Sequence, residues 1–531
     1  MASQTPDTLT PSISANRQIA RAAGTVMAAF VLSNVIGLVR QILITRAFGV
    51  DAALDAYYAA ARLPELVFSL VAGGALASAF IPTFTGLIED KKKAEAWQLT
   101  SAISNLLIVV LVAACALAWL FAGPLVSRVL VPAASGAQQA LTTELLRIQL
   151  LTPILFGLSG LMMGVLNAHQ SFLLPAIAPS MNWVGVIIGV LFFVPGMGVR
   201  GLAWGSVLGA GLHLAVQIPG LMRLKPSYTF TLGRGIKNVG DVARLMGPRL
   251  LGQAAVQINF VVNTIIASGL AVGSQAAIII AFQVMTMPQI VIAQAIAIAA
   301  LPTFSAQFAG GRLTELRASL ASTLRGVLLL SVPASVGLIL LREPIVELLF
   351  QRGAFGVRDT QLVAWALLWY AAGLVGHSVV EIVSRAFYAL HDTRTPVAVG
   401  VGAMGLNAVL SLVLPGVFAA RGWLPLGGLA LANSAATAIE MVVLLALMQG
   451  RLEGIEFKRL AQGFGQATLA AAAMWAALWW WQRFFGDASV WLLAGGGILV
   501  GGAVYGLAAW AMRVPELGEL SGALLRRVRR G

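Results

Sequence analysis

The sequence has little of what a soluble enzyme is built from. Only 11% of its 531 residues are charged and 59% are hydrophobic, whereas an ordinary soluble domain carries roughly a quarter charged residues. The mean hydropathy is +0.87. This composition excludes a soluble globular enzyme and indicates a chain that crosses a membrane many times.

Residues for metal, redox and nucleophilic chemistry are also scarce. The single cysteine, Cys115, excludes an intramolecular disulfide and the CxxC pairs of redox and zinc sites. No GxSxG, GxxxxGK[ST] or clustered aspartate pair occurs, so we predict no enzymatic activity and no cofactor. The four histidines show neither HxxxH nor HExxH spacing, so no metal site is predicted; they are His169, His213, His377 and His391.

Long apolar runs fill most of the chain. A membrane-spanning helix needs roughly 20 mostly apolar residues, and a window of that length predicts about fourteen helices. An even number places both termini on one side of the membrane. The predicted spans are 22–48, 61–88, 97–122, 141–166, 172–195, 199–222, 242–270, 274–303, 321–342, 361–388, 396–419, 424–448, 464–483 and 488–513.

Positive charge is concentrated on the side of the termini. The 35 Lys and Arg exceed the 21 Asp and Glu, for a net charge of +14. In a soluble chain this excess would suggest a nucleic-acid partner, but here it lies between apolar runs, so no nucleic acid is expected. Basic groups such as residues 91–93 and 526–530 share one side, and the positive-inside rule makes that side cytoplasmic.

Two sequence echoes indicate a duplication. ASAFIPTF around Pro82 resembles AIAALPTF around Pro302, at an offset of 302 − 82 = 220. Pro175 and Pro396 each open a span after a polar loop, at an offset of 396 − 175 = 221. The period covers six spans, so the halves should be related by an axis near the membrane normal and should enclose a central cavity.

The sequence therefore predicts an all-α polytopic membrane protein with two six-helix repeat lobes. The expected parts are a disordered cytoplasmic tail (1–16), an N-terminal lobe (17–222), a cytoplasmic linker (223–241), a C-terminal lobe (242–448), two extra helices (464–513) and a basic cytoplasmic tail (514–531).

A few charged residues lie within or beside the first two spans. Arg40 is eight residues from the end of the first span, roughly 12 Å inside it. Arg62 and Glu65 are spaced i, i+3 and can pair, while Asp55 can cap a helix or pair with Arg40. Either these groups form an ion-pair network that sets the angle between the two helices, or they form a cationic pocket for a phosphate. Spacing alone leaves both interpretations open.

Uncharged amides follow in the seventh and eighth spans. They are Gln253, Gln257, Asn259 and Asn263 in the seventh span and Gln283, Gln289 and Gln294 in the eighth. Such side chains can bind sugar hydroxyls in a wet cavity, and they are equally common as hydrogen bonds between helices.

Seven stretches together resemble one known family. They are SNVIGLVRQILITRAFG with LDAYYAAARLPELVFSLVAGGALASAFIPTF, GVLNAHQSFLLPAIAPSMNWVGVI, RLMGPRLLG with NTIIAS, LLFQRGAF, and RAFYALHDTRTPVAV. In this order, from about residue 20 to 420, they resemble the MurJ (MviN) lipid II flippases of the multidrug/oligosaccharidyl-lipid/polysaccharide exporter superfamily.

The resemblance implies a transporter in the bacterial cytoplasmic (inner) membrane, V-shaped and two-lobed around a central cavity. Its expected partners are membrane lipids and an undecaprenyl-pyrophosphate-linked sugar-peptide, the peptidoglycan precursor lipid II. The implied activity is movement of this precursor from the inner to the outer leaflet by alternating access.

The resemblance also implies a binding site with fewer charges than is usual in the family. Arg40 and Asp55 match charged positions of the family, but Asn34, Phe68, Gln283 and Thr286 stand where it usually has charged residues. A different lipid-linked oligosaccharide, an amphipathic drug, or a scaffold role without transport therefore remain alternatives. The expected substrate-binding residues are Asn34, Arg40, Asp55, Arg62, Glu65, Gln257, Asn263 and Gln283.

Overall fold

The computed structural model is helical, with no strand among the residues that it describes. These are residues 13–71, 75–233, 236, 239–240, 242, 244 and 257–514. In lipid, backbone N–H and C=O groups can be satisfied only within helices or a closed barrel, so an apolar chain of this kind folds as helices. The predicted all-α membrane fold is confirmed.

Eleven stretches of the described chain are long and apolar enough to cross a membrane, and each matches a predicted span. Of the remaining predictions, 61–88 contains two helices on either side of residues 72–74, which lie outside the described part. The span 242–270 is described mainly at Gln257–Ala267, a shorter apolar helix, and 464–483 lies within a helix that is not among the eleven. The count of fourteen stays a prediction, as do the terminal tails.

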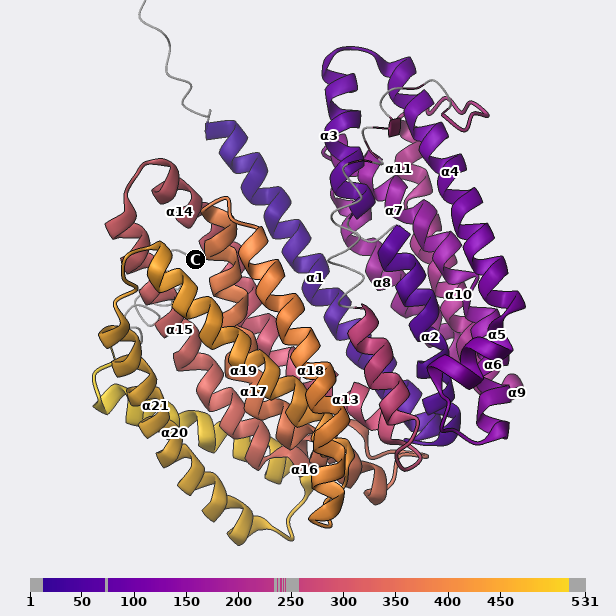
Figure 1. Ribbon diagram of the computed structural model, residues 1–531. Helices are drawn as coiled ribbons and strands as arrows, with labels where there is room; N and C mark the ends of the chain where they lie inside the picture. Colours follow the sequence, from indigo (N-terminus) through magenta and orange to yellow (C-terminus); the bar gives the residue numbers. More distant parts are fainter. Residues whose placement is uncertain are drawn as a thin grey trace, which may run out of the picture. The chain divides into compact units, whose positions relative to one another are not determined.

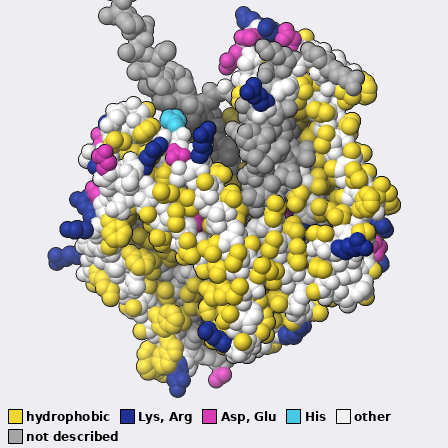
Figure 2. Space-filling view, in the orientation of Figure 1, with side chains coloured by type: hydrophobic (Ala, Val, Ile, Leu, Met, Phe, Trp, Pro, Cys, Tyr) yellow, Lys and Arg dark blue, Asp and Glu magenta, His cyan; other side chains and the backbone are white. Residues whose placement is uncertain are grey.

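Apolar side chains cover most of the surface visible in Figure 2, and charged ones form small, scattered groups. Large hydrophobic side chains such as Leu120, Leu412 and Leu499 are 66%, 68% and 75% exposed. An exposed apolar surface of this extent would cause aggregation in water. On spans of this length it is the surface that faces lipid.

The chain forms two compact units. The structure brings the end of the first helix and the start of the second into the second unit, which the sequence did not anticipate. The lobe boundaries predicted from the sequence, and the cavity between lobes, stay predictions. The first unit comprises Met1–Ile44, Ala60–Val126 and Gln139–Ala254, and the second Thr45–Ala59, Ser127–Gln138 and Ala255–Gly531.

The helices of the first unit run from indigo to magenta in Figure 1. Four of these elements reach into the second unit: α1, α2, η1 and α6. Two short π-helical turns, η1 and η2, interrupt the regular hydrogen bonding of the α-helices. The elements are α1 (Ile13–Phe48), α2 (Ala52–Val71), α3 (Ala75–Glu89), α4 (Lys93–Leu120), α5 (Ala122–Leu125), η1 (Val126–Leu130), α6 (Gly136–Gln149), α7 (Thr152–Ala168), α8 (Leu173–Ile188), η2 (Gly189–Phe193), α9 (Val194–Met197), α10 (Val199–Ala215) and α11 (Ile218–Arg223).

Small residues let α8 and α10 approach each other closely. A Cβ atom on Gly205 would stand 2.8 Å from the Cα atom of Gly189, and one on Gly185 would overlap the backbone of Gly209. Glycines four residues apart give flat helix surfaces that pack backbone to backbone in membranes. This contact holds α8, which carries Trp183, in a fixed place within the first unit.

The second unit contains the remaining helices, drawn from magenta to yellow in Figure 1. Its core lies between α14, α15, α17 and α19 and is centred on Phe304, Leu320, Ile382 and Phe387. The elements are the helix Gln257–Ala267, α13 (Ser274–Gln289), η3 (Ile290–Gln294), α14 (Ala295–Ala309), α15 (Leu313–Leu340), α16 (Arg342–Phe350), α17 (Val357–Ala389), α18 (Arg394–Ala420), α19 (Leu426–Arg451), α20 (Phe457–Phe485), η4 (Leu492–Gly496) and α21 (Gly497–Ala511).

Corresponding helices of the two units have equal lengths. Helices α3 and α14 both have 15 residues, and their first residues differ by 295 − 75 = 220. Helices α4 and α15 both have 28 residues, and here too the offset is 313 − 93 = 220. Pro175 is the third residue of α8 and Pro396 the third of α18. Both echoes seen in the sequence therefore fall at equivalent places in the two units.

Candidate functional site

Arg40 lies against an aromatic ring of its own unit. Its guanidinium carbon is 4.2 Å from the centre of the Trp183 ring, and its Nη2 donates a hydrogen bond to Gln41 Oε1 at 3.1 Å. Gly37, one turn earlier on α1, leaves room for the indole. The side chain is half-buried, and a desolvated cation–π contact contributes about 2 kcal/mol. The ring therefore holds a positive charge at a defined place at membrane depth.

Asn34 does not extend this positive group. Its side chain is exposed, and its Nδ2 donates to the carbonyl oxygen of Phe30, one turn earlier in α1, at 2.8 Å. Six residues separate it from Arg40, so the two side chains leave α1 in directions roughly 120° apart. The sequence therefore placed both residues correctly along the helix, but they do not share a face.

Arg62 and Glu65 form the i, i+3 ion pair that their spacing predicts. The Arg62 Nη1 lies 3.0 Å from the Glu65 Oε2, and the Glu65 side chain is 53% exposed. Exposed pairs of this kind contribute at most about 1 kcal/mol. The pair thus orients the Arg62 side chain on α2 more than it stabilises the fold.

Phe68, on α2, makes an aromatic contact. The Phe68 ring lies 5.3 Å from that of Phe156, which in turn meets the edge of the His213 ring. His213 Nδ1 is 2.6 Å from Ser159 Oγ, and the Gln217 amide donates to the His213 carbonyl oxygen at 3.0 Å. This buried cluster joins α7 to α10. In the sequence, the spacing of the histidines predicts no metal site at His213 and gives no sign of this cluster.

Asp55 is a capping residue, one of the two roles expected for it. Its two carboxylate oxygens accept hydrogen bonds from the backbone N–H groups of Gly273, at 2.6 Å, and Ala276, at 2.8 Å. A capping residue usually lies at the start of the helix that it caps. Asp55 instead caps α13, which begins more than 200 residues later in the chain. A carboxylate at a helix N-terminus satisfies unpaired N–H groups and interacts well with the helix dipole.

Burial raises the pKa of Asp55 to about 6, against an ordinary value of 3.8, and the hydrogen bonds from Ala276 and Gly273 offset only part of this rise. The side chain is 5% exposed. Desolvation disfavours the charged form of a carboxylic acid. The cap on α13 is therefore sensitive to pH in a range that cells reach.

A second carboxylate binds the turn between α1 and α2. Asp359 Oδ2 accepts from the backbone N–H of Val50 at 3.3 Å and from that of Gly356 at 3.2 Å. Gly49 in this turn has φ +63°, and a Cβ there would stand 2.7 Å from both the Ala354 carbonyl oxygen and Asp359 Oδ2. Within the second unit, Asp359 thus ties the α1–α2 turn to the start of α17.

The amide residues of the second unit are partly buried. Gln257 and Asn263 lie on the helix Gln257–Ala267, and Gln283 lies on α13. The Oδ1 atoms of Asn259 and Asn263, one turn apart, are buried without a hydrogen-bond partner among the described residues. Buried polar atoms usually find a partner. These two oxygens are therefore acceptors available to a ligand or to water, which favours cavity lining over helix-to-helix bonding for Asn263.

A charged pair in α17 was overlooked in the sequence. Arg385 Nη2 lies 2.9 Å from Glu381 Oε1, and both side chains are nearly three-quarters buried. Their i, i+4 spacing was a legible signal. In the described ranges no group of three or more His, Cys, Asp or Glu side chains is arranged to hold a metal ion.

The predicted residues are divided between the two units. Arg40, Asn34, Arg62 and Glu65 belong to the first unit, and Asp55, Gln257, Asn263 and Gln283 to the second. Arg62 and Glu65 are joined directly. The sequence missed Trp183, Asp359 and the His213 cluster, because each acts through a partner far away along the chain.

Known proteins resemble this chain over most of its length. The lipid II flippase MurJ of Burkholderia cenocepacia is 32% identical over 395 residues, which cover 72% of this chain and 76% of the relative. A probable lipid II flippase MurJ of Bdellovibrio bacteriovorus is 32% identical over 450 residues, covering 83% and 84%.

Among solved structures, that of lipid II flippase MurJ in its inward closed conformation matches with a TM-score of 0.78 at 24% identity, covering 93% of this chain and 99% of the other. At this identity the match supports the fold. The sequence profile described as "Lipid II flippase MurJ" matches residues 44–493. The chain belongs to the lipid II flippase MurJ family.

Proposed function

We propose that this protein is a flippase that moves lipid II, the undecaprenyl-pyrophosphate-linked sugar-peptide, from the inner to the outer leaflet by alternating access. Membership of the family supports this cargo. The single observation that carries the proposal is Arg40, a cation held at membrane depth on the face of Trp183. Charged groups in lipid are costly and persist where they bind something.

The guanidinium of Arg40 suits a pyrophosphate. Among the described residues, Gln41 accepts from one of its five N–H donors. The others can form charge-assisted, bidentate hydrogen bonds with phosphate oxygens, which a lysine ammonium cannot match in geometry. Because the ring of Trp183 already limits the rotamers of Arg40, less side-chain entropy is lost when the anion binds.

The amides supply contacts that are not charged. Asn263 offers a buried carbonyl oxygen without a partner in the described part of the chain, and sugar hydroxyls are its natural donors. We propose that Gln257, Asn263 and Gln283 contact the sugar part of the cargo, where other family members use more charge. Asp55 and the Arg62–Glu65 pair position helices around the site.

We further propose the membrane and the orientation. The protein lies in the bacterial cytoplasmic membrane with both termini in the cytoplasm, as the distribution of Lys and Arg between the spans favours. The two repeats form lobes at 17–222 and 242–448, joined by the linker 223–241 and followed by two extra helices at 464–513.

The test is a leaflet-resolved assay with purified protein in liposomes that contain lipid II. Wild-type protein should make inner-leaflet lipid II accessible from outside, and Arg40→Gln should reduce the initial rate by at least about tenfold, as loss of a charge-assisted hydrogen bond predicts. Arg421→Gln is the matched control, because Arg421 also lies over an indole, 5.6 Å from the Trp423 ring centre. Its rate should equal that of wild type.

The same assay separates the alternative cargos. If wild-type protein moves another lipid-linked oligosaccharide or an amphipathic drug but not lipid II, the cargo proposed here is wrong. If Arg40→Gln moves lipid II at the wild-type rate, the proposed role of Arg40 is wrong.

A further inference from the structure

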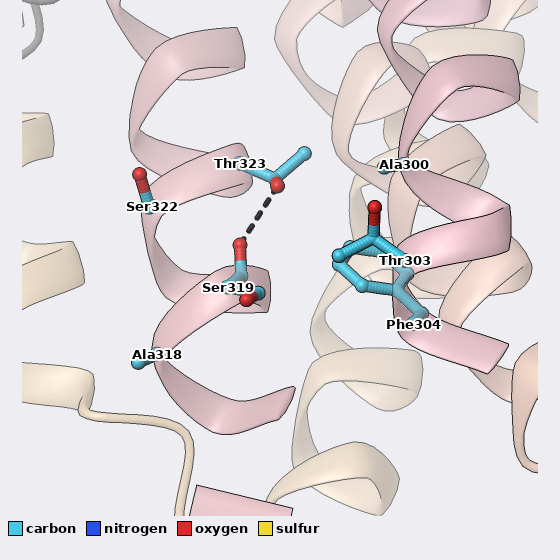
Figure 3. Close-up of a pocket in the computed structure, with 7 residues that line it drawn as sticks. All are labelled: Ala300, Thr303, Phe304, Ala318, Ser319, Ser322 and Thr323. Atoms are coloured by element: carbon cyan, nitrogen blue, oxygen red, sulfur yellow. Dashed lines mark hydrogen bonds between the residues drawn. The ribbon is translucent and has the colours of Figure 1, made fainter. Parts of the chain in front are cut away.

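The second unit contains a pocket lined with hydroxyl groups between α14 and α15 (Figure 3). Its volume is about 430 Å³. Thr303 on α14 and Thr323 on α15 face each other across it, with Phe304 and Ala300 beside Thr303. Ser319 and Ser322 complete the side formed by α15. The pocket combines an apolar surface with four hydroxyl groups.

At three of the equivalent positions the first unit has apolar residues, while Thr83 keeps the hydroxyl that corresponds to that of Thr303. The offset of 220 that relates α3 to α14 and α4 to α15 pairs Ala300 with position 80, Ser319 with position 99 and Thr323 with position 103. The residues there are Phe80, Leu99 and Ile103, which are 0%, 0% and 5% exposed and belong to the apolar core. The Phe80 ring stacks on that of Phe84 at 5.2 Å. At these three positions the first unit is thus filled by large apolar side chains, while the second unit has smaller side chains, two of which carry hydroxyl groups.

Several polar atoms of the pocket are available. The Thr323 hydroxyl donates to the Ser319 carbonyl oxygen, and the Gln307 amide donates to Ser319 Oγ at 2.8 Å. Gln307 Oε1 is buried and has no hydrogen-bond partner within the described ranges. Thr303 and Ser322 are exposed, and their hydroxyls have no hydrogen-bond partner in the described part of the chain, so they can donate or accept. The site therefore offers donors to an anion and an orphan acceptor to a hydroxyl or amine.

The depth of the pocket indicates the kind of ligand. Thr303 precedes the end of α14 by six residues, and Ser319 follows the start of α15 by six, so both lie about 9 Å along the helices from the connecting turn. The interfacial layer of a bilayer is roughly 5–7 Å thick on each side. The span predicted at 274–303 ends at Thr303, so we place the pocket at the level where lipid headgroups meet their acyl chains.

Two arginines stand near the connecting turn: Arg312 directly precedes α15, and Arg317 is the fifth residue of that helix. Arg312 pairs with Glu315 at 3.0 Å and Arg317 with Glu453 at 3.4 Å, and the carboxylate partners are 54% and 88% exposed. Each pair uses one of the five N–H donors of its arginine. The remaining donors can contact a phosphate that enters from the membrane surface.

We propose that this pocket is a binding site for the headgroup of an anionic glycerophospholipid of the phosphatidylglycerol type. The phosphate accepts hydrogen bonds from Thr303 and Ser322 and interacts with Arg317. A glycerol hydroxyl donates to Gln307 Oε1, and the acyl chains follow the apolar surface beside Phe304. This site is separate from the proposed cargo site, and it gives a membrane lipid a means to brace α14 against α15.

In the test, three residues of the pocket are replaced by the residue types that stand at the equivalent positions of the first unit. Purified wild-type protein and the triple variant Ala300→Phe, Ser319→Leu, Thr323→Ile are reconstituted in vesicles of equal parts phosphatidylglycerol and phosphatidylcholine, and co-purifying lipids are counted by native mass spectrometry. Wild type should retain phosphatidylglycerol in preference to phosphatidylcholine, and the variant should retain about tenfold less of it.

Two further variants control for folding and for surface effects. Thr303→Val with Ser322→Ala removes two hydroxyls at nearly constant volume and should also lose the preference for phosphatidylglycerol. Thr468→Val removes a hydroxyl on α20 that bonds only within its own helix, and it should retain the lipid as wild type does.

Three results would overturn the proposal. They are equal retention of phosphatidylglycerol by wild type and the triple variant, equal retention of the two lipids by wild type, and displacement of the lipid by millimolar inorganic phosphate. The last result would assign the pocket to a free anion instead.

Discussion

The guanidinium of Arg40 and the indole of Trp183 form one structural group, with 4.2 Å between the guanidinium carbon and the ring centre. Arg40 lies on α1 and Trp183 on α8. The glycine contacts between α8 and α10 hold α8 in place, and with it the indole. A cation at membrane depth is normally free to bend toward the headgroups. Here the ring keeps it in place.

Replacing the ring should impair transport while leaving the charge intact. Trp183→Leu removes a contact of about 2 kcal/mol, so we expect the rate of lipid II translocation to fall by up to about 30-fold. Trp423→Leu removes the indole beneath Arg421 and should leave the rate unchanged. Equal rates in Trp183→Leu and wild type would contradict the role of the ring.

Stability should depend on pH through Asp55. Because its pKa is about 6 in the folded protein and 3.8 ordinarily, the folded state binds more protons than the unfolded state between these values. The free energy of unfolding should therefore fall as pH rises from about 4 to 6, by about 3 kcal/mol at most.

Asp55→Asn should remove this dependence. The amide oxygen can still accept one of the two N–H groups of α13, and no charge is left to desolvate. Unfolding of both proteins in detergent, followed at several pH values between 4 and 7, measures the difference. Parallel curves for the two proteins would rule out Asp55 as the titrating group.

Gly273→Ala should destabilise the second unit. Gly273 has φ +92°, and a Cβ there would overlap the Val50 carbonyl oxygen. A non-glycine residue in this left-handed region costs about 1–2 kcal/mol, and the overlap adds to it. Gly422→Ala is the control, since Gly422 has φ +72° with nothing within 4 Å of a Cβ. The prediction fails if both variants lower the unfolding midpoint equally.

Gly185→Ala should weaken the contact between α8 and α10. The added methyl group would overlap the backbone of Gly209, so the helices must separate, and overpacking of this kind costs about 1–3 kcal/mol. Gly211→Ala on α10 meets open space and should be neutral or slightly stabilising, because alanine favours helix. Thermal unfolding of the purified variants measures both. A Gly185→Ala midpoint at or above that of Gly211→Ala would refute close packing here.

Local features of the site could be read from the sequence. The Arg62–Glu65 pair follows from i, i+3 spacing on a helix, and the matching positions of Pro175 and Pro396 follow from the repeat. The role of Asp55 as a cap was foreseen, but not the helix that it caps, because its partner Gly273 is 218 residues away. The pairing of Arg40 with Trp183, 183 − 40 = 143 residues apart, could not be foreseen for the same reason.

By itself the sequence determined that this chain is a bundle of membrane helices built from a duplicated unit. Lipid leaves the backbone no other way to satisfy its hydrogen bonds, and apolar length and proline position are properties of the linear chain. Only the tertiary structure decided which polar groups meet, and that one copy of the repeat holds an open, hydroxyl-lined pocket where the other is packed with Phe80, Leu99 and Ile103. Such contacts depend on which helix faces which, and a helix period cannot show what lies opposite.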